Sequence, residues 1–142
     1  MIDAKTAPYA ALTLRIALGA MFIAHALLKL FVFTLPGTAQ FFESLGLPGF
    51  LGYATFAAEL VGGTMILLGI KTRWVAALLM PILLGATWVH FANGWLFTAL
   101  KGGWEYPAFL AAAALAQALL GDGAYALSSA FNRRTAAQLR TA

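Results

Sequence analysis

Apolar residues fall into four long runs along the chain, separated by short stretches that contain polar residues, glycine or proline. A helix that crosses the hydrocarbon core of a bilayer needs about 20 mostly apolar residues. The four runs that approach this length are Tyr9–Phe33, Leu51–Ile70, Trp74–Trp95 and Tyr106–Leu120. This pattern predicts an all-α fold, an integral membrane four-helix bundle, that forms a single transmembrane domain over residues 1–142.

The ends and connections of these runs carry further signals. Pro36-Gly37 is expected to end the first helix, and Thr38–Leu45 predicts a short interfacial helix in the first external loop, capped by Gly46. The small residues on either side of His25 resemble a signal-peptide cleavage site, but the apolar run continues well beyond it, which favours a retained helix. Residues 124–142 are less apolar and are predicted to form a cytoplasmic tail.

The composition favours the lipid bilayer as the environment of the chain. Hydrophobic residues make up 62% of the 142 residues and charged residues 10%, whereas a soluble domain has roughly 25% charged residues. So few polar side chains argue against a soluble enzyme and a disordered protein, and the nine scattered Lys and Arg residues argue against a nucleic-acid partner. Because the chain has no cysteine, it contains no disulfide and no thiolate ligand or nucleophile.

The distribution of basic residues predicts the orientation in the membrane. Six of them lie on one side of a four-span protein: Lys5, Lys71, Arg73, Arg133, Arg134 and Arg140. The opposite side has Lys101 and, near a helix end, Lys29. Since basic loops are retained in the cytoplasm, we expect a multi-pass protein of the cell inner (plasma) membrane with both termini cytoplasmic. Aromatic residues at the run ends predict two interfacial belts, with Tyr106 in the outer belt.

Charged residues also occur inside the apolar runs, where each costs about 2.5–3.5 kcal/mol and commonly marks a functional site. In the first run, Arg15, Phe22, His25 and Lys29 fall within one arc of roughly 80° on the helix. The second run has Glu59 near its middle. Because a paired charge is less costly to bury, Arg15 or Lys29 is the expected partner of Glu59.

The later runs contribute polar residues toward their outer ends. His90 and Asn93 share one face of the third run, and Glu105 precedes the fourth. These residues are expected at about the same depth as His25 and Lys29. A stripe of small residues at positions 54, 58 and 62 permits close helix contact, so a homo-oligomer is a further expectation.

These residue types match the requirements of a quinone or a similar small apolar redox molecule. As candidate catalytic residues, His25 or His90 would donate a proton, Lys29 would stabilise negative charge, and Glu59 would hold the cation or relay protons. The candidate cofactor-binding residues are Arg15, Phe22, Trp88, Asn93 and Glu105, with Phe33 and Phe91 as further apolar walls. Haem held by the two histidines is less favoured because no haem-specific motif is present, and no metal site is predicted.

The same residues are also compatible with other roles. Arg15 and Glu59 would then form a structural pair, Lys29 would reach the interface, and His25 and His90 would each bond a backbone carbonyl. A non-catalytic scaffold or assembly subunit for a partner oxidoreductase would use the basic surface around Lys71, Arg73, Arg133 and Arg134. A small proton or solute conductor would use the intramembrane charges, so whether the chain is an enzyme stays open.

Several motifs occur in a characteristic order along nearly the whole chain. They are Arg15-x-x-x-Gly19, His25-x-x-x-Lys29, Phe41-Phe42-Glu43-Ser44-Leu45-Gly46-Leu47-Pro48, Glu59-Leu60-Val61-Gly62-Gly63, Leu68-Gly69-x-x-Thr72-Arg73, His90 with Asn93-Gly94, Glu105-Tyr106 and Gly121-Asp122-Gly123. In these the sequence closely resembles the DoxX family of small four-helix membrane proteins, which is related to the DoxD subunit of thiosulfate:quinone oxidoreductase. The resemblance implies a membrane component of an oxidoreductase system, linked to sulfur oxidation, quinone reduction or oxidative-stress defence. Without cysteine, sulfur chemistry here would need a peripheral oxidoreductase or sulfur-transfer partner.

Overall fold

The computed structural model describes residues 3–129, and this part of the chain is all-helical. Its helices are α1 (Ala7–Phe31), α2 (Leu35–Ser44), α3 (Phe50–Leu68), α4 (Thr72–Phe91) and α5 (Glu105–Leu120). A further helix begins at Leu127, and most of the predicted tail, including Arg133, Arg134 and Arg140, lies outside the described residues. The all-α prediction is therefore confirmed over residues 3–129.

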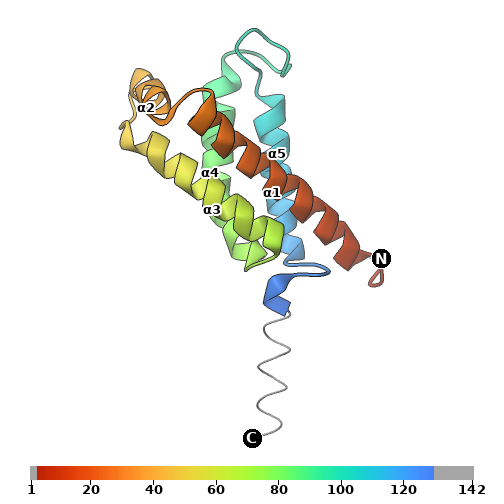
Figure 1. The fold of residues 1–142 in the computed structure, drawn as a ribbon. Helices are drawn as coiled ribbons and strands as arrows, with labels where there is room; N and C mark the ends of the chain where they lie inside the picture. Colours follow the sequence, from red (N-terminus) through yellow and green to blue (C-terminus); the bar gives the residue numbers. More distant parts are fainter. Residues whose placement is uncertain (1–2, 130–142) are drawn as a thin grey trace, which may run out of the picture.

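The long helices α1, α3, α4 and α5 pack side by side, and the short α2 lies at one end of them beside the start of α3 (Figure 1). The most extensive contacts join α1 to α3 and α4 to α5, while α3 also contacts α4 and α1 contacts α5. Their shared core consists of Leu18, Phe22, Ile66, Val75, Ala76, Leu79, Leu83, Ala111 and Ala114. Residues of α1, α3, α4 and α5 thus bury one another in this core.

Two glycines allow α1 and α3 to approach closely. A Cβ atom added at Gly19 would lie 2.9 Å from the carbonyl oxygen of Gly63, and one at Gly63 would lie 2.8 Å from the Cβ of Phe22. The α1–α3 contact therefore depends on the absence of side chains at both positions. Of the predicted small-residue stripe, Gly62 packs against Leu79 of α4, whereas Ala54 is exposed.

Three of the helices, α1, α3 and α4, are long and apolar enough to cross a membrane. The predicted fourth span is α5, which has 16 residues and is about 24 Å long at the α-helical rise per residue. The hydrocarbon core of a bilayer is about 30 Å thick. The four-span bundle therefore stays a prediction, because α5 by itself is shorter than the hydrocarbon core.

The first connection differs from the prediction. Pro36 was expected to end the first helix, but it lies in the first turn of α2, where its missing N–H group costs no hydrogen bond. The Thr34 Oγ1 atom accepts the N–H of Gly37 at 3.2 Å, so α2 begins before the predicted Thr38. Gly46 follows α2 with φ at +77°, in agreement with its predicted role as a cap.

Candidate functional site

A buried ion pair joins α1 to α3. The Lys29 Nζ atom donates to both carboxylate oxygens of Glu59, at 2.7 and 3.0 Å. The Glu59 side chain is 6% exposed and the Lys29 side chain 16% exposed. Of the two predicted partners of Glu59, the structure thus selects Lys29. Contact with both oxygens matters because a buried carboxylate is tolerated only when its charge and lone pairs are satisfied.

His25 lies one helical turn before Lys29 on α1. Its Nδ1 atom is 2.8 Å from the carbonyl oxygen of Met21. Because a carbonyl oxygen only accepts, this contact assigns the hydrogen to Nδ1 and leaves Nε2 of a neutral ring free to accept a proton. The His25 ring also stacks on Tyr106, with ring centroids 5.9 Å apart and an interplanar angle of 22°.

Tyr106 belongs to this group, although the sequence predicts it only for the outer aromatic belt. From the first turn of α5 its hydroxyl group donates to the Met21 sulfur at 3.6 Å, so the side chain bridges α5 and α1. The residue is only partly exposed. The Glu105-Tyr106 motif could have marked Tyr106 as a residue of the site. No pattern in the sequence, however, shows which way its ring is directed.

His90 and Asn93 both bond the segment that joins α4 to α5. His90 Nδ1 lies 3.1 and 3.0 Å from the carbonyl oxygens of Lys101 and Gly102. Asn93 Nδ2 donates to the same two oxygens at 3.2 and 2.9 Å. These side chains hold the α4–α5 loop (residues 92–104). The alternative interpretation expects both His25 and His90 to bond a backbone carbonyl, and both do so.

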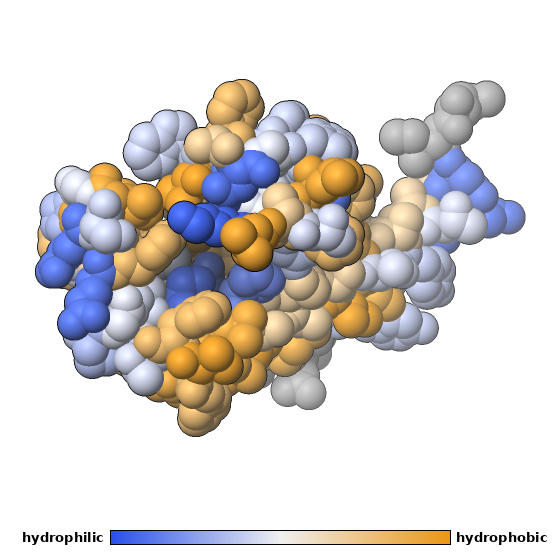
Figure 2. All heavy atoms as spheres, turned by 90° about the horizontal axis from the view of Figure 1, so that it is seen from above, coloured by the Kyte–Doolittle hydropathy of each residue, from blue (hydrophilic) through white to orange (hydrophobic). Residues whose placement is uncertain are grey.

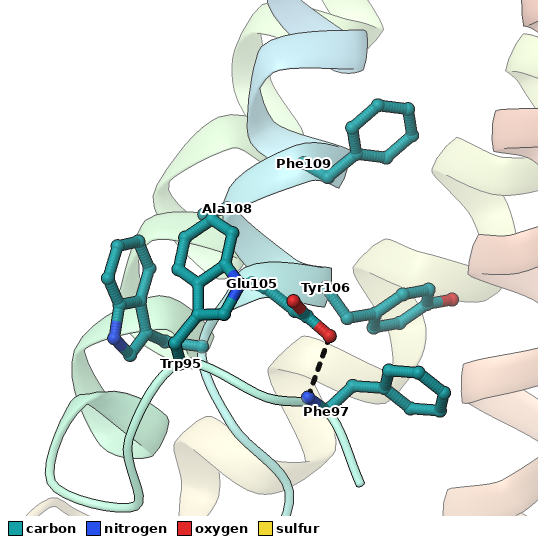
Figure 3. Close-up of a pocket in the computed structure, with 7 residues that line it drawn as sticks. Trp95, Phe97, Glu105, Tyr106, Ala108 and Phe109 are labelled. Atoms are coloured by element: carbon teal, nitrogen blue, oxygen red, sulfur yellow. Dashed lines mark hydrogen bonds between the residues drawn. The ribbon is translucent and has the colours of Figure 1, made fainter.

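An apolar groove of about 530 Å³ lies between the α4–α5 loop and the start of α5. Its lining residues are Trp95, Phe97, Trp104, Glu105, Tyr106, Ala108 and Phe109. The Glu105 carboxylate accepts the backbone N–H of Phe97 at 2.9 Å. In Figure 3 the rings of Tyr106 and Phe97 lie on one side of this carboxylate and the Trp95 ring lies on the other. Tyr106 therefore borders the groove and also contacts His25.

The remaining predicted wall residues are dispersed. Phe22 is part of the bundle core, whereas Phe33 and Phe91 are exposed. Trp88 is also exposed and lines a separate shallow groove of about 320 Å³ beside Leu45. Viewed from the end that carries α2 and the α4–α5 loop, hydrophilic side chains lie in a hollow between hydrophobic ones (Figure 2).

Arg15 lies about 21 Å along α1 from Lys29, as 14 residues of helix require. It is 2% exposed, and its Nη1 atom donates to the backbone oxygen of Asp122 at 2.6 Å. The Asp122 carboxylate accepts the N–H of Thr72 at 2.7 Å and the hydroxyl of Ser128. Asp122, which the sequence offers only as part of a motif, thus links α1, the start of α4 and the segment after α5.

This network sets the charge state of Asp122. Partial burial raises the pKa of its carboxyl group, but the hydrogen bonds from Ser128 and Thr72 and the positive charge of Arg15 lower it further than burial raises it. The net pKa is below the usual value for an aspartate. Asp122 therefore carries a negative charge at neutral pH beside the guanidinium group of Arg15.

Residues 10–92 match the DoxX family model. The chain belongs to the DoxX family. It is also similar to a protein of Bacillus subtilis (strain 168) named "Putative oxidoreductase CatD", with 43% identity over 75 residues, which is 53% of this chain and 54% of that protein. The chain spans about half the length of this curated relative. No solved structure matches the chain.

In this DoxX protein the family match covers His25, Lys29, Glu59 and His90, but neither Glu105 nor the groove. The polar side chains described above fall into three groups: the ion pair with His25, the supports of the α4–α5 loop, and the Arg15–Asp122 network. Only the first combines a base, a cation and a carboxylate within the membrane-crossing helices. Chemically, that group can exchange protons and stabilise negative charge on a bound molecule.

Proposed function

We propose that this DoxX protein is a membrane component of an oxidoreductase system and binds a quinone, or a similar small apolar redox molecule, beside the Lys29–Glu59 pair. The observation that carries the proposal is the ion pair itself, because charges in membrane-spanning helices are costly and commonly mark functional sites. The family and the word oxidoreductase in the relative's name support the redox class. We further propose an inner-membrane location with both termini cytoplasmic, from the basic residues of the connecting segments.

We place the ring of such a molecule in the apolar groove beside Tyr106, which is linked to the ion pair through His25 and is not itself lined by Lys29 or Glu59. Ligand sites typically have volumes of about 300–1,000 Å³ and mostly apolar walls with a few polar groups. The groove has a volume of about 530 Å³ and is lined by four aromatic side chains besides Tyr106, with Glu105 as its charged residue. A molecule dissolved in lipid would enter it sideways, leave its apolar tail in the bilayer, and meet Tyr106, whose ring is stacked on His25.

A bound quinone would supply two-electron, two-proton chemistry. The chain's own part is to deliver protons and to stabilise charge: His25 Nε2 takes up or releases a proton, while Nδ1 keeps its bond to Met21. Lys29 stabilises negative charge, and Glu59 holds the Lys29 ammonium group in place. His25 is favoured over His90 as the proton donor because it lies one helical turn from Lys29 and stacks on Tyr106, which borders the groove. Electrons would come from a peripheral partner.

Thermal unfolding in nanodiscs with added short-chain quinones tests the proposal. A ligand at 100 times its Kd stabilises the folded protein by about 2.7 kcal/mol, so the midpoint temperature should rise with quinone concentration. The double variant Lys29→Met/Glu59→Leu removes both charges together and should lose this response. Glu43→Gln, which alters an exposed carboxylate on α2, should keep it.

A folded wild-type protein that no quinone stabilises would contradict the proposal and favour the scaffold alternative. An equal rise in the double variant would show that quinone binds without the ion pair, which would contradict the assigned site.

A further inference from the structure

The α4–α5 loop (residues 92–104) exposes large apolar side chains beyond the ends of the helices that it joins. Leu96 and Phe97 are well exposed, and Leu100 is fully exposed. The loop projects from the end of the molecule that also carries α2 (Figure 1). Exposing these three apolar side chains to water would be unfavourable in free energy.

Part of the backbone of this loop is paired within the protein. The N–H groups of Trp104 and Glu105 donate to the carbonyl oxygens of Gly94 and Trp95, each at 3.1 Å. The N–H of Phe97 donates to the Glu105 carboxylate at 2.9 Å.

Side chains of α4 and the following turn satisfy two further backbone groups. The carbonyl oxygens of Lys101 and Gly102 accept hydrogen bonds from His90 and Asn93. In hydrocarbon each unpaired backbone group costs several kcal/mol, because no water is present to take its place. These bonds satisfy part of the loop backbone, but within the described residues the N–H groups of Leu96, Thr98 and Leu100 have no partner, so they need water or lipid headgroups nearby.

The length of α5 gives an independent reason to place the loop close to the hydrocarbon core. With 16 residues the helix covers about 24 Å of a hydrocarbon core that is about 30 Å thick. The segment just before Glu105 falls within the remaining distance of about 6 Å. Trp95 and Trp104, which contact one another with ring centroids 4.5 Å apart, are the residue type that lies at the membrane interface.

We propose that the α4–α5 loop lies in the membrane interface, so that Leu96, Phe97 and Leu100 contact lipid while the loop backbone stays at the level of the headgroups. Lipid is the favoured occupant because the loop is continuous with exposed apolar residues of the adjoining helices, Phe91 on α4 and Phe109 on α5. Lys101 extends its ammonium group toward the headgroups from this position. The inference does not depend on the proposed quinone site.

Single-cysteine spin labelling tests the lipid contact directly, since the chain has no cysteine of its own. Leu96→Cys and Leu100→Cys, each carrying a nitroxide in proteoliposomes, are compared by their collisions with oxygen and with a water-soluble nickel chelate. We expect the ratio of oxygen to nickel accessibility to shift toward that of Leu78→Cys, a lipid-facing control at an exposed position of α4. Lys5→Cys, exposed before α1, is the water control.

Nickel accessibility equal to that of the Lys5→Cys label would overturn the proposal, because the loop would then lie in water. Low accessibility to both reagents would also overturn it, since a protein surface rather than lipid would cover the loop.

Discussion

A charged residue inside a membrane-spanning helix needs a partner of opposite charge. Lys29 and Glu59 are such partners for each other. The pair joins α1 and α3 through two hydrogen bonds of 2.7 and 3.0 Å, and both side chains are largely buried. Removing one partner leaves the other charge buried without compensation, whereas removing both leaves an apolar contact. The pair is therefore more sensitive to a single substitution than to a double one.

We expect Lys29→Met to destabilise the protein by about 3–5 kcal/mol, the usual cost of breaking a buried pair. Lys29→Met/Glu59→Leu should recover a large part of this loss. Reversible unfolding in mixed micelles gives the free energies, with Glu43→Gln as an exposed-carboxylate control. If the double variant lost as much stability as the two single variants combined, the side chains would not be coupled.

At the scale of elements, the α1–α3 contact depends on two glycines rather than on large apolar side chains. A Cβ at Gly19 would meet backbone atoms of Gly63 and Leu67 at 2.9 Å, and backbone atoms yield little. Glycine in a helix interior is otherwise less favourable than alanine by about 1 kcal/mol. Its presence in both helices is explained by the close approach, which also brings Lys29 within reach of Glu59.

Gly19→Ala and Gly63→Ala should each destabilise the protein by about 1–3 kcal/mol through overpacking. Gly85→Ala is the matched control, because it too lies inside a helix, α4, but its added Cβ would meet nothing within 4 Å. That variant should be neutral or stabilising by up to about 1 kcal/mol. Equal effects at all three positions in thermal unfolding would indicate helix propensity alone and contradict the packing argument.

At the scale of the whole molecule, the Arg15–Asp122 network connects the first half of α1 and the start of α4 with the segment after α5. Asp122 accepts from Thr72 and Ser128, and its backbone oxygen binds Arg15. Its lowered pKa means that the folded state favours the charged carboxylate. Folding stability from this group is therefore complete above the ordinary aspartate pKa and is lost as pH falls through the lower pKa of the folded state.

We expect the unfolding free energy of the wild type to fall more steeply on acidification below about pH 4 than that of Asp122→Asn. The asparagine side chain keeps an oxygen that can accept the Thr72 N–H but carries no titratable charge. Unfolding midpoints measured across the acid range, with Glu43→Gln as the exposed-carboxylate control, give the comparison. Parallel curves for wild type and Asp122→Asn would contradict the assigned role of the carboxylate.

The sequence alone determined the helices and the family, because both depend on local information. Runs of apolar residues identify α1, α3 and α4 as membrane-crossing candidates, and ordered motifs identify the DoxX family. Helix ends were less accurate, as at Pro36, since a proline can begin a helix as readily as it ends one. The sequence also identified the charged residues within apolar runs as candidate site residues, because a charge in lipid is costly whatever its neighbours are.

Only the tertiary structure decided which of these residues meet. Lys29 and Glu59 are 30 residues apart, and Arg15 and Asp122 are 107 apart. Such pairings depend on how far each helix is rotated about its axis, which the close contact of Gly19 and Gly63 fixes for α1 and α3. The same holds for Tyr106, whose ring turns toward His25 because α5 packs against α1. Local hydrophobicity shows that a helix forms and that a charge in it is costly, but packing between helices determines which partner satisfies that charge.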